Sequence, residues 1–357
     1  MDYFTQAVLG AAVGQATMHR DIGNKAVLWG VLGGVLPDLD MLVNPLFDPV
    51  TQLTWHRSVT HGILFAVIAS LLLGWLIARV HSGQITFEKT TIFALLALGT
   101  HMLIDLFTTY GTQVLAPFSD HAFSFNTLFI IDPLYTLPLL IFLLLSLLPG
   151  ETRAKLFRNA IGLTLSSAYV LVALLLKFST LTSFEREIER QHIPAQRVTT
   201  SATPFNTMLW RCVAETADGY FIGYRSVFDE QHEVSFWYVP RNGQLLEAIK
   251  DQRAVETLKW FSDGWYSVSK DEQGLQFNDL RFGEYDTTSP ERDFGLNNPL
   301  NLAYFFSFRF VETGATEGPD QLTIRQADFR LSGAGAIIDA LWKRLKGLER
   351  KTPAVGK

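Results

Sequence analysis

The sequence predicts an all-α helical membrane bundle of about five spans with an N-terminal interfacial helix, followed by a soluble α+β domain with an antiparallel sheet. Two observations predict this division. Only 19 of the 65 charged residues fall in residues 1–178, and the other 46 fall in residues 179–357. Long apolar stretches occupy the first half, whereas the second half alternates apolar and polar residues, which is typical of strands.

Five apolar stretches in the first half are long enough to cross a membrane. At about 1.5 Å per residue, roughly 20 helical residues cover a hydrocarbon core of about 30 Å. The first stretch is rich in glycine, so it is either re-entrant or packed inside the bundle. Residues 4–18, which precede it, are too few to span and predict an interfacial or core-packed helix. The five predicted spans are residues 26–43, 63–80, 91–108, 127–148 and 158–178.

Positive charges orient these spans, because cytoplasmic connections carry an excess of Lys and Arg. Seven Lys and Arg residues lie in three alternate connections, and only Arg57 lies in the other two. With five spans, this bias puts the N-terminus in the cytoplasm and the second half outside it. We therefore predict a multi-pass protein of the bacterial inner membrane with an extracytoplasmic C-terminal domain. The three basic connections are residues 19–25, 79–90 and 149–158.

The predicted domains are a membrane domain at 1–180, a linker helix at 181–194, an accessory α+β domain at 195–345 and a basic tail at 346–357. Aromatic-rich alternating segments and the turn signal Asp218-Gly219 predict hairpins in the accessory domain. The net charge of −5 argues against nucleic acid as the main partner. The single cysteine, Cys212, excludes a zinc site built from several cysteines.

Ionisable residues cluster near the predicted outer ends of the spans. Each costs about 2.5–3.5 kcal/mol inside a membrane on insertion scales, so such a cluster requires a function. Asp120, His121 and Asp132 lie close by but are weaker candidates. The six main candidates are Asp38, Asp40, His56, His61, His101 and Asp105.

The spacing of these six residues suits a metal site. His101 and Asp105 are four residues apart and so lie on one face of a helix. Asp38 and Asp40 follow a proline at a helix end, where both side chains reach one site. Histidine and carboxylate ligands without cysteine suit zinc, manganese or iron. Six ligands exceed one tetrahedral site, which leaves two adjacent metals, or one metal with supporting carboxylates.

Three residues are candidates for catalysis. Arg57 either pairs with the aspartates or stabilises a phosphate or an oxyanion. Asp40 or Asp105 is a candidate general base if it is not a metal ligand. Each residue also has a structural interpretation, because a single Asp near a helix end is usually a cap and a single His is usually a hydrogen-bonded structural residue. The clustering of six such residues favours the metal site.

The motifs that carry these residues resemble the membrane-bound metal-dependent hydrolases of the YdjM-like family. The resemblance covers residues 1–150 and rests on TQAVLGAAVG, GNKAVLWG, LPDLD, WHRSVTHG, HMLIDLFTTYGTQ and IIDPLYTLP. It implies that the six main candidates are the metal ligands of a hydrolase. The family label also describes LexA binding and association with the inner membrane. The family is similar, at a distance, to zinc-dependent phospholipases C and P1-type nucleases.

The sequence and the resemblance together predict an inner-membrane hydrolase with a divalent metal at the outer leaflet, zinc before manganese or iron. The position among lipid headgroups favours a phosphoester of a membrane lipid or a lipid-linked substrate. The alternative is a non-enzymatic membrane protein that binds metal, or a scaffold whose outer domain binds a partner. An open coordination position beside the metal distinguishes the hydrolase from the alternative.

Overall fold

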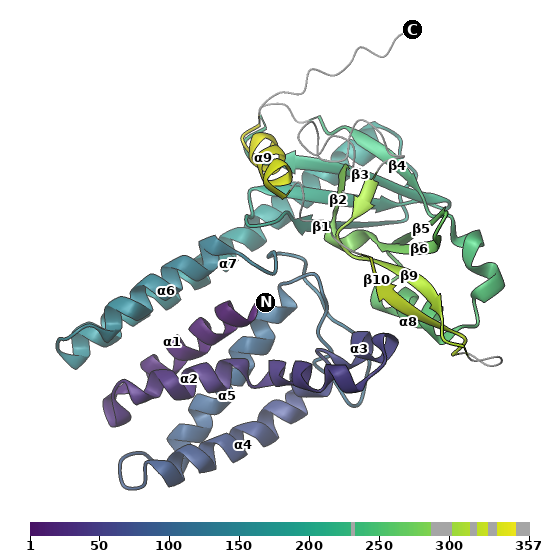
Figure 1. Ribbon diagram of the computed structural model, residues 1–357. Helices are drawn as coiled ribbons and strands as arrows, with labels where there is room; N and C mark the ends of the chain where they lie inside the picture. The colour runs from purple at the N-terminus through teal and green to yellow at the C-terminus, as the bar shows by residue number, and fades with distance from the viewer. Residues whose placement is uncertain (230–232, 287–301, 315–319, 328–333, 348–357) are drawn as a thin grey trace. The chain divides into compact units, whose positions relative to one another are not determined.

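The computed structural model divides the chain into two compact units (Figure 1). The helical unit comprises Met1–Leu175 with Pro204–Asn206, and the sheet unit comprises Leu176–Thr203 and Thr207–Lys357. The helix α7, Thr152–Arg190, contributes to both units. The structure describes residues 1–229, 233–286, 302–314, 320–327 and 334–347.

The predicted domain boundaries differ from these units and stay a prediction. Residues 181–190 of the predicted linker belong to α7. Residues 348–357, most of the predicted basic tail, lie outside the described residues.

Side chains at the helix starts fix where the helices of the helical unit begin. Asp2 accepts a hydrogen bond from the Thr5 amide at the start of α1, and Thr86 accepts one from the Lys89 amide at the start of α5. The helices are α1 (Tyr3–Ile22), α2 (Lys25–Val35), α3 (Pro49–Trp55), α4 (Ile63–Val80), α5 (Phe87–Leu106), α6 (Pro133–Leu147) and α7, with the short 3-10 helices η1 (Pro37–Leu42), η2 (Asn44–Leu46) and η3 (Val59–His61).

Three helices, α4, α5 and α7, are long and apolar enough to cross a membrane. The predicted first span is a pair, Lys25–Val35 and Pro37–Leu46, bent by 57°, which is a broken span or a re-entrant loop. The break falls at Pro37, which cannot donate a backbone hydrogen bond to continue α2. The predicted fourth span forms α6, which has 15 residues. The count of five spans is therefore not confirmed, because the described helices give three spans, or four with the bent pair.

The helix α1 packs inside the helical unit. Most of its side chains are buried, including the polar Gln6, so it matches a core-packed helix rather than an interfacial one. Where α1 crosses α2, the backbones of the two helices are in close contact. A Cβ added to Gly10 would lie only 2.2 Å from the carbonyl oxygen of Gly30. Glycines four residues apart on each helix, Gly10 with Gly14 and Gly30 with Gly34, permit this approach.

The two ends of the helical unit differ in charge. At one end, Lys89 Nζ lies 2.5 Å from Asp21 Oδ2, so two of the basic connections meet there. At the other end of α1, the amino group of Met1 contacts the carboxylate of Asp105 on α5. Since α1 runs between these ends, Met1 lies opposite the basic connections, and the prediction that placed it on their side is wrong.

The described strands of the sheet unit pair in antiparallel fashion, as predicted. One sheet has the order β1-β2-β3-β4, a second has the order β10-β9-β6-β5, and β7 pairs with β8. The Asp218-Gly219 turn joins β2 to β3. The strands are β1 (Arg197–Ala202), β2 (Leu209–Glu215), β3 (Gly219–Ser226), β4 (Phe236–Pro240), β5 (Tyr266–Asp271), β6 (Gly274–Asp279), β7 (Glu284–Asp286), β8 (Leu302–Tyr304), β9 (Ser307–Glu312) and β10 (Leu322–Gln326).

Helices and large aromatic side chains complete the sheet unit. Trp210, Tyr220 and Phe277 are among its fully buried side chains. The helices are α8 (Arg253–Phe261) and α9 (Ala334–Leu345), with the 3-10 helices η4 (Gly243–Ile249) and η5 (Leu280–Phe282).

Candidate metal centre

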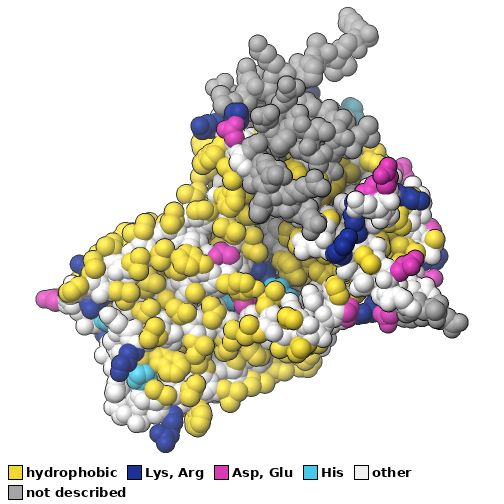
Figure 2. All heavy atoms as spheres, in the orientation of Figure 1, with side chains coloured by type: hydrophobic (Ala, Val, Ile, Leu, Met, Phe, Trp, Pro, Cys, Tyr) yellow, Lys and Arg dark blue, Asp and Glu magenta, His cyan; other side chains and the backbone are white. Residues whose placement is uncertain are grey.

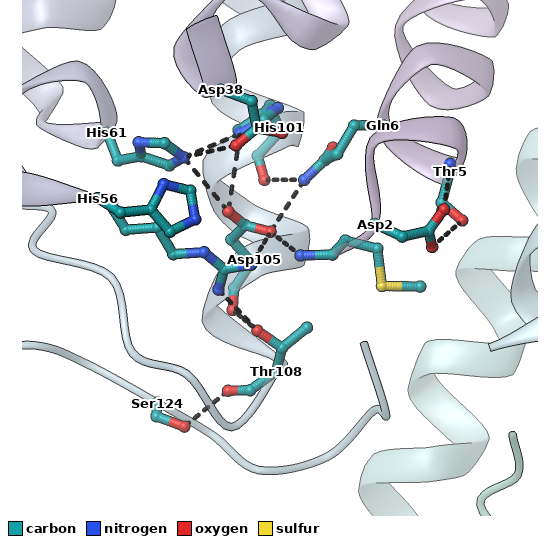
Figure 3. A network of polar contacts seen from close by, with 12 residues as sticks. Asp2, Thr5, Gln6, Asp38, His56, His61, His101, Asp105, Thr108 and Ser124 are labelled. Carbon is teal, nitrogen blue, oxygen red and sulfur yellow. Dashed lines mark hydrogen bonds and ion pairs between the residues drawn. The ribbon is translucent and has the colours of Figure 1, made fainter. Parts of the chain in front are cut away.

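Four short segments of the helical unit bring the six candidate ligands together in two adjoining groups. Figure 3 labels all of them except Asp40. Asp38 and Asp40 lie in η1, directly after Pro37, where the bent pair of helices breaks. His56 caps the C-terminal end of α3, and His61 ends η3. His101 and Asp105 lie one turn apart on α5, as their spacing predicts.

Asp38, His61, His101 and Asp105 form what we call the inner group. All four are buried, and one ligand atom from each lies within 4.8 Å of the others. The Nε2 atoms of His61 and His101 are 3.2 Å apart. Asp38 Oδ1 lies 3.3 and 3.7 Å from these two nitrogens, and Asp105 Oδ2 lies 3.5 and 3.6 Å from them.

These separations match the edges of a tetrahedral metal site. A metal bound at about 2.0–2.2 Å by nitrogen and oxygen separates its ligands by about 3.3–3.6 Å. The donor set also fits zinc, manganese or iron, because it contains imidazole nitrogens and carboxylate oxygens. The inner group therefore has both the spacing and the chemistry of a metal site.

The hydrogen bonds of the two imidazoles aim lone pairs at the centre of the inner group. His101 Nδ1 lies 2.6 Å from the carbonyl oxygen of Gly34, which can only accept, so Nδ1 carries the proton. Thr60 donates its hydroxyl to Asp40 and lies 3.0 Å from His61 Nδ1, so this nitrogen is also the donor. With both rings neutral, the two Nε2 atoms present lone pairs to each other, and a bound cation would satisfy both.

The carboxylate of Asp105 is held by one oxygen and leaves the other facing the histidines. Its Oδ1 accepts a 2.9 Å hydrogen bond from Gln6 Nε2 and contacts the Met1 amino group, and Arg57 Nη2 lies 3.3 Å away. Its Oδ2 has no hydrogen-bond partner among the described residues, although it is buried. A buried carboxylate oxygen without a donor is costly, which again favours a cation in the inner group.

Asp38, Asp40 and His56 form a second set of close ligand atoms, which we call the outer group. His56 Nδ1 lies 3.1 and 3.3 Å from the two carboxylate oxygens of Asp40. Asp38 belongs to both groups, so the two sets adjoin. The His56 side chain is 15% exposed, whereas those of His61 and His101 are fully buried.

Arg57 lies between the two groups. Its backbone amide donates to Asp40 Oδ2 at 3.2 Å, and its Nη1 donates to Thr108 Oγ1 at 2.9 Å. Its guanidinium also lies over the ring of Tyr110, 5.1 Å from the centroid. The backbone of Arg57 has a φ of 60°, which a residue other than glycine seldom adopts without a requirement of the site.

The weaker candidates lie outside both groups. Asp120 and His121 are exposed. Asp132 caps α6 by accepting the Leu134 amide at 3.0 Å, and it also accepts the Tyr169 hydroxyl at 2.9 Å. Sequence reasoning missed the residues that orient the ligands, which are Gln6, the Gly34 carbonyl, Thr60 and Thr108. Of these residues, only Gln6 could have been noticed in the sequence, because it is a polar residue inside an apolar helix.

Comparisons with known proteins agree with the family resemblance. The model of the YdjM inner membrane protein family matches residues 1–182, about half of the chain. An uncharacterized protein of Bacillus subtilis (strain 168), YfhP, is 26% identical over 299 residues, which cover 79% of this chain and 87% of that protein. The inner membrane protein YbcI of Escherichia coli (strain K12) is 29% identical over 122 residues, which cover 33% of this chain and 69% of that protein.

These matches differ in extent. The similarity to YfhP covers more of the chain than the family model does, so it extends into the sheet unit. No solved structure matches the chain.

The three apolar helices and the family match both support a location in the inner membrane. The chain belongs to the YdjM inner membrane protein family.

Proposed function

We propose that this protein is an inner-membrane hydrolase whose divalent metal, most simply Zn²⁺, is held by the inner group. One observation carries the proposal. The Nε2 atoms of two histidines lie 3.2 Å from each other and 3.3 to 3.7 Å from two carboxylate oxygens, and all four side chains are buried. Such an arrangement is costly unless a cation occupies it.

The chemistry of the site suits hydrolysis of an ester of phosphoric acid. A bound divalent metal supplies Lewis acidity, which polarises a phosphoryl oxygen and makes water a stronger nucleophile near neutral pH. Arg57 adds a buried positive charge beside the carboxylates of Asp40 and Asp105, where it would attract a phosphoryl oxygen. The sequence-based assignment of Asp40 or Asp105 as a general base stays a prediction, and in this proposal Asp105 is a metal ligand.

The surroundings of the site support a lipid or lipid-linked substrate. Leu42 and Leu46, which follow the two aspartates in η1 and η2, have 75% and 81% of their surface exposed, and Phe118 in the next connection has 82%. Hydrophobic side chains also cover most of the visible face of the helical unit (Figure 2). An apolar surface of this extent belongs in a bilayer, so a substrate that reaches this end of the unit would come from the membrane.

Metal analysis of purified full-length protein tests the ligand assignment. We expect His101→Ala and Asp105→Ala each to remove bound metal, and the double variant to lose little more, because ligands of one ion act as a unit. Inductively coupled plasma mass spectrometry measures the metal content. His121→Ala is the control, since it changes an exposed histidine that lies outside both groups. Full metal content in both single variants would refute the assignment.

A structural metal site is the second candidate function. The inner group offers four buried protein ligands, which is the number found in structural metal sites, whereas catalytic sites usually have three. The two functions differ in what metal removal does. In a hydrolase, a chelator abolishes release of a lipid headgroup from vesicles while the helices stay folded, and readdition of metal restores activity. In a structural site, the chelator unfolds the helical unit and no phosphoester is cleaved at any metal concentration.

A further inference from the structure

The outer group supplies what the inner group lacks, namely a position that substrate can reach. We propose that Asp38, Asp40 and His56 bind a second divalent metal ion, with Asp38 bridging the two positions, and that this outer ion faces the substrate. The role in substrate binding rests on the proposed hydrolase function, whereas the metal binding itself does not.

Asp38 is the residue that links the two positions. Its Oδ1 faces the imidazoles of His61 and His101 at 3.3 and 3.7 Å. Its Oδ2 is buried and has no hydrogen-bond partner among the described residues, and the whole residue is 6% exposed. One oxygen is thus directed to the inner group and the other has no donor, which is the arrangement of a carboxylate that bridges two cations.

Asp40 and His56 complete the outer group. Asp40 Oδ2 accepts hydrogen bonds from the Arg57 amide and the Thr60 hydroxyl, at 3.2 and 3.1 Å. These bonds fix the carboxylate and turn Oδ1 toward His56 Nδ1, 3.1 Å away. Neighbouring ligands of one ion have about this separation when each is about 2.0–2.2 Å from the metal. Asp40 would then be a ligand that is oriented by two residues of its own loop.

Exposure gives the two positions different roles. The inner group offers four protein ligands, and its two histidines are fully buried. The outer group offers three protein ligands, and the His56 side chain is 15% exposed. Three ligands with a free position is the pattern of catalytic metal sites, whereas four is the pattern of structural ones. Both ions would then serve the proposed reaction: the outer ion would bind the phosphoryl group, and the inner ion would lie beside it and share Asp38 with it.

The test counts metal ions and measures their coupling. Full-length protein is stripped with a chelator, loaded with Mn²⁺ and desalted, and bound manganese is measured by mass spectrometry. We expect about two ions per chain in the wild type and in His121→Ala, and about one in His56→Ala and Asp40→Asn. Electron paramagnetic resonance of the wild type gives a second measurement that needs no variant. Two ions that share a carboxylate are magnetically coupled, and His56→Ala should restore the signal of an isolated Mn²⁺ ion.

The outcomes separate this proposal from the hydrolase proposal. One uncoupled ion per chain in the wild type, unchanged in His56→Ala, would show that Asp40 and His56 are only a hydrogen-bonded pair. The inner metal site would survive that result, and the assay of headgroup release would still decide the proposed function separately. Absence of bound metal in the wild type would refute both proposals. Two ions lost together in His56→Ala would contradict independent positions, and circular dichroism of both variants shows whether the loss reflects unfolding.

Discussion

At the scale of single residues, Gln6 shows how a ligand is aimed from a distant part of the chain. It lies on α1, yet its Nε2 donates to Asp105 Oδ1 at 2.9 Å and to the carbonyl oxygen of His101 at 3.2 Å. Both contacts hold the turn of α5 that carries the two ligands. Because Gln6 engages Oδ1 of Asp105, it leaves Oδ2 to face the imidazoles, which is the role of an outer partner of a metal ligand.

We expect Gln6→Leu to weaken metal binding about 10-fold to 100-fold, the usual loss when a hydrogen-bond partner of a ligand is removed. Leucine fills a similar volume but cannot donate, so Asp105 is free to rotate. Competition with a chelator of known affinity measures the change on the purified full chain.

Gln15→Leu is the matched control for this prediction. Gln15 is also fully buried on α1, but its Nε2 donates to Ser146 Oγ at 3.2 Å, away from both metal groups. The two substitutions remove the same amide from the same helix. An equal loss of metal affinity in both variants would show that Gln6 acts through the stability of the bundle and not through Asp105.

The sequence predicts those parts of the site that depend on short separations along the chain. His101 and Asp105 share a helix face because four residues make about one turn, and the structure brings both into the inner group. Thr60 and the Gly34 carbonyl escape sequence reasoning, because they act through contacts that only the folded loops create. The sequence left two roles open for Arg57, which were pairing with the aspartates and stabilising a phosphate or an oxyanion. In the structure its backbone amide contacts Asp40 and its guanidinium contacts Asp105.

At the scale of elements, the crossing of α1 and α2 connects the glycine pattern to the metal site. A Cβ on Gly34 would lie 2.4 Å from the Gln6 carbonyl oxygen, so Gly34 must be small for α1 to approach. The carbonyl oxygen of the same Gly34 accepts the proton of His101 Nδ1. The close crossing therefore positions both Gln6 and Gly34, one on each side of the α5 ligands.

We expect Gly30→Ala to destabilise the helical unit by about 1–3 kcal/mol, the usual cost of forcing an extra group into a packed interior. Its Cβ would lie 2.3 Å from the carbonyl oxygen of Gly10, which is backbone and cannot move aside without parting the helices. Thermal unfolding in detergent measures the effect, and metal content should fall with it.

Gly99→Ala is the control for the predicted effect of Gly30→Ala. Gly99 lies within α5, and a Cβ there would meet nothing within 4 Å. Alanine has a higher helix propensity than glycine by about 0.8–1.0 kcal/mol, so this variant should be as stable as the wild type or more stable. A loss of stability in Gly99→Ala equal to that in Gly30→Ala would contradict the role of the crossing.

Elements whose signals are local could be predicted, and elements set by tertiary packing could not. The Asp218-Gly219 turn follows from two adjacent residues, and the structure contains it between β2 and β3. The pair bent at Pro37 was predicted as one glycine-rich span, either re-entrant or packed inside the bundle, and the position of the bend was not predicted.

At the scale of the whole molecule, charge and geometry agree on two distinct ends of the helical unit. Two connections, which carry four of the seven Lys and Arg residues, adjoin the ends of α1, α4 and α5 where Lys89 meets Asp21. Arg57, the one cation of the other connections, is 2% exposed and belongs to the candidate metal site. The positive-inside rule therefore predicts that the basic end faces the cytoplasm and the metal groups face outward.

Cysteine labelling tests this orientation, because the chain has one native cysteine and it is unreactive. Cys212 is fully buried, and burial raises the pKa of its thiol, which leaves little thiolate to react. We expect a membrane-impermeant maleimide to label Asp120→Cys, in the connection between α5 and α6, in intact spheroplasts. Ser82→Cys, in the connection between α4 and α5, should be labelled only after lysis. Both positions are exposed, so access to the reagent differs only by side of the membrane.

The same experiment places the sheet unit, which the sequence predicts to be extracytoplasmic. Asp218→Cys lies at the exposed turn between β2 and β3, and we expect it to be labelled in intact spheroplasts like Asp120→Cys. The 39 residues of α7 extend about 58 Å, more than the hydrocarbon core of about 30 Å, so the helix can cross the membrane and still enter the sheet unit. Labelling of Ser82→Cys alone before lysis would invert the topology and put the metal groups on the cytoplasmic side. Labelling of Asp120→Cys without Asp218→Cys would instead show that α7 returns the sheet unit to the cytoplasm.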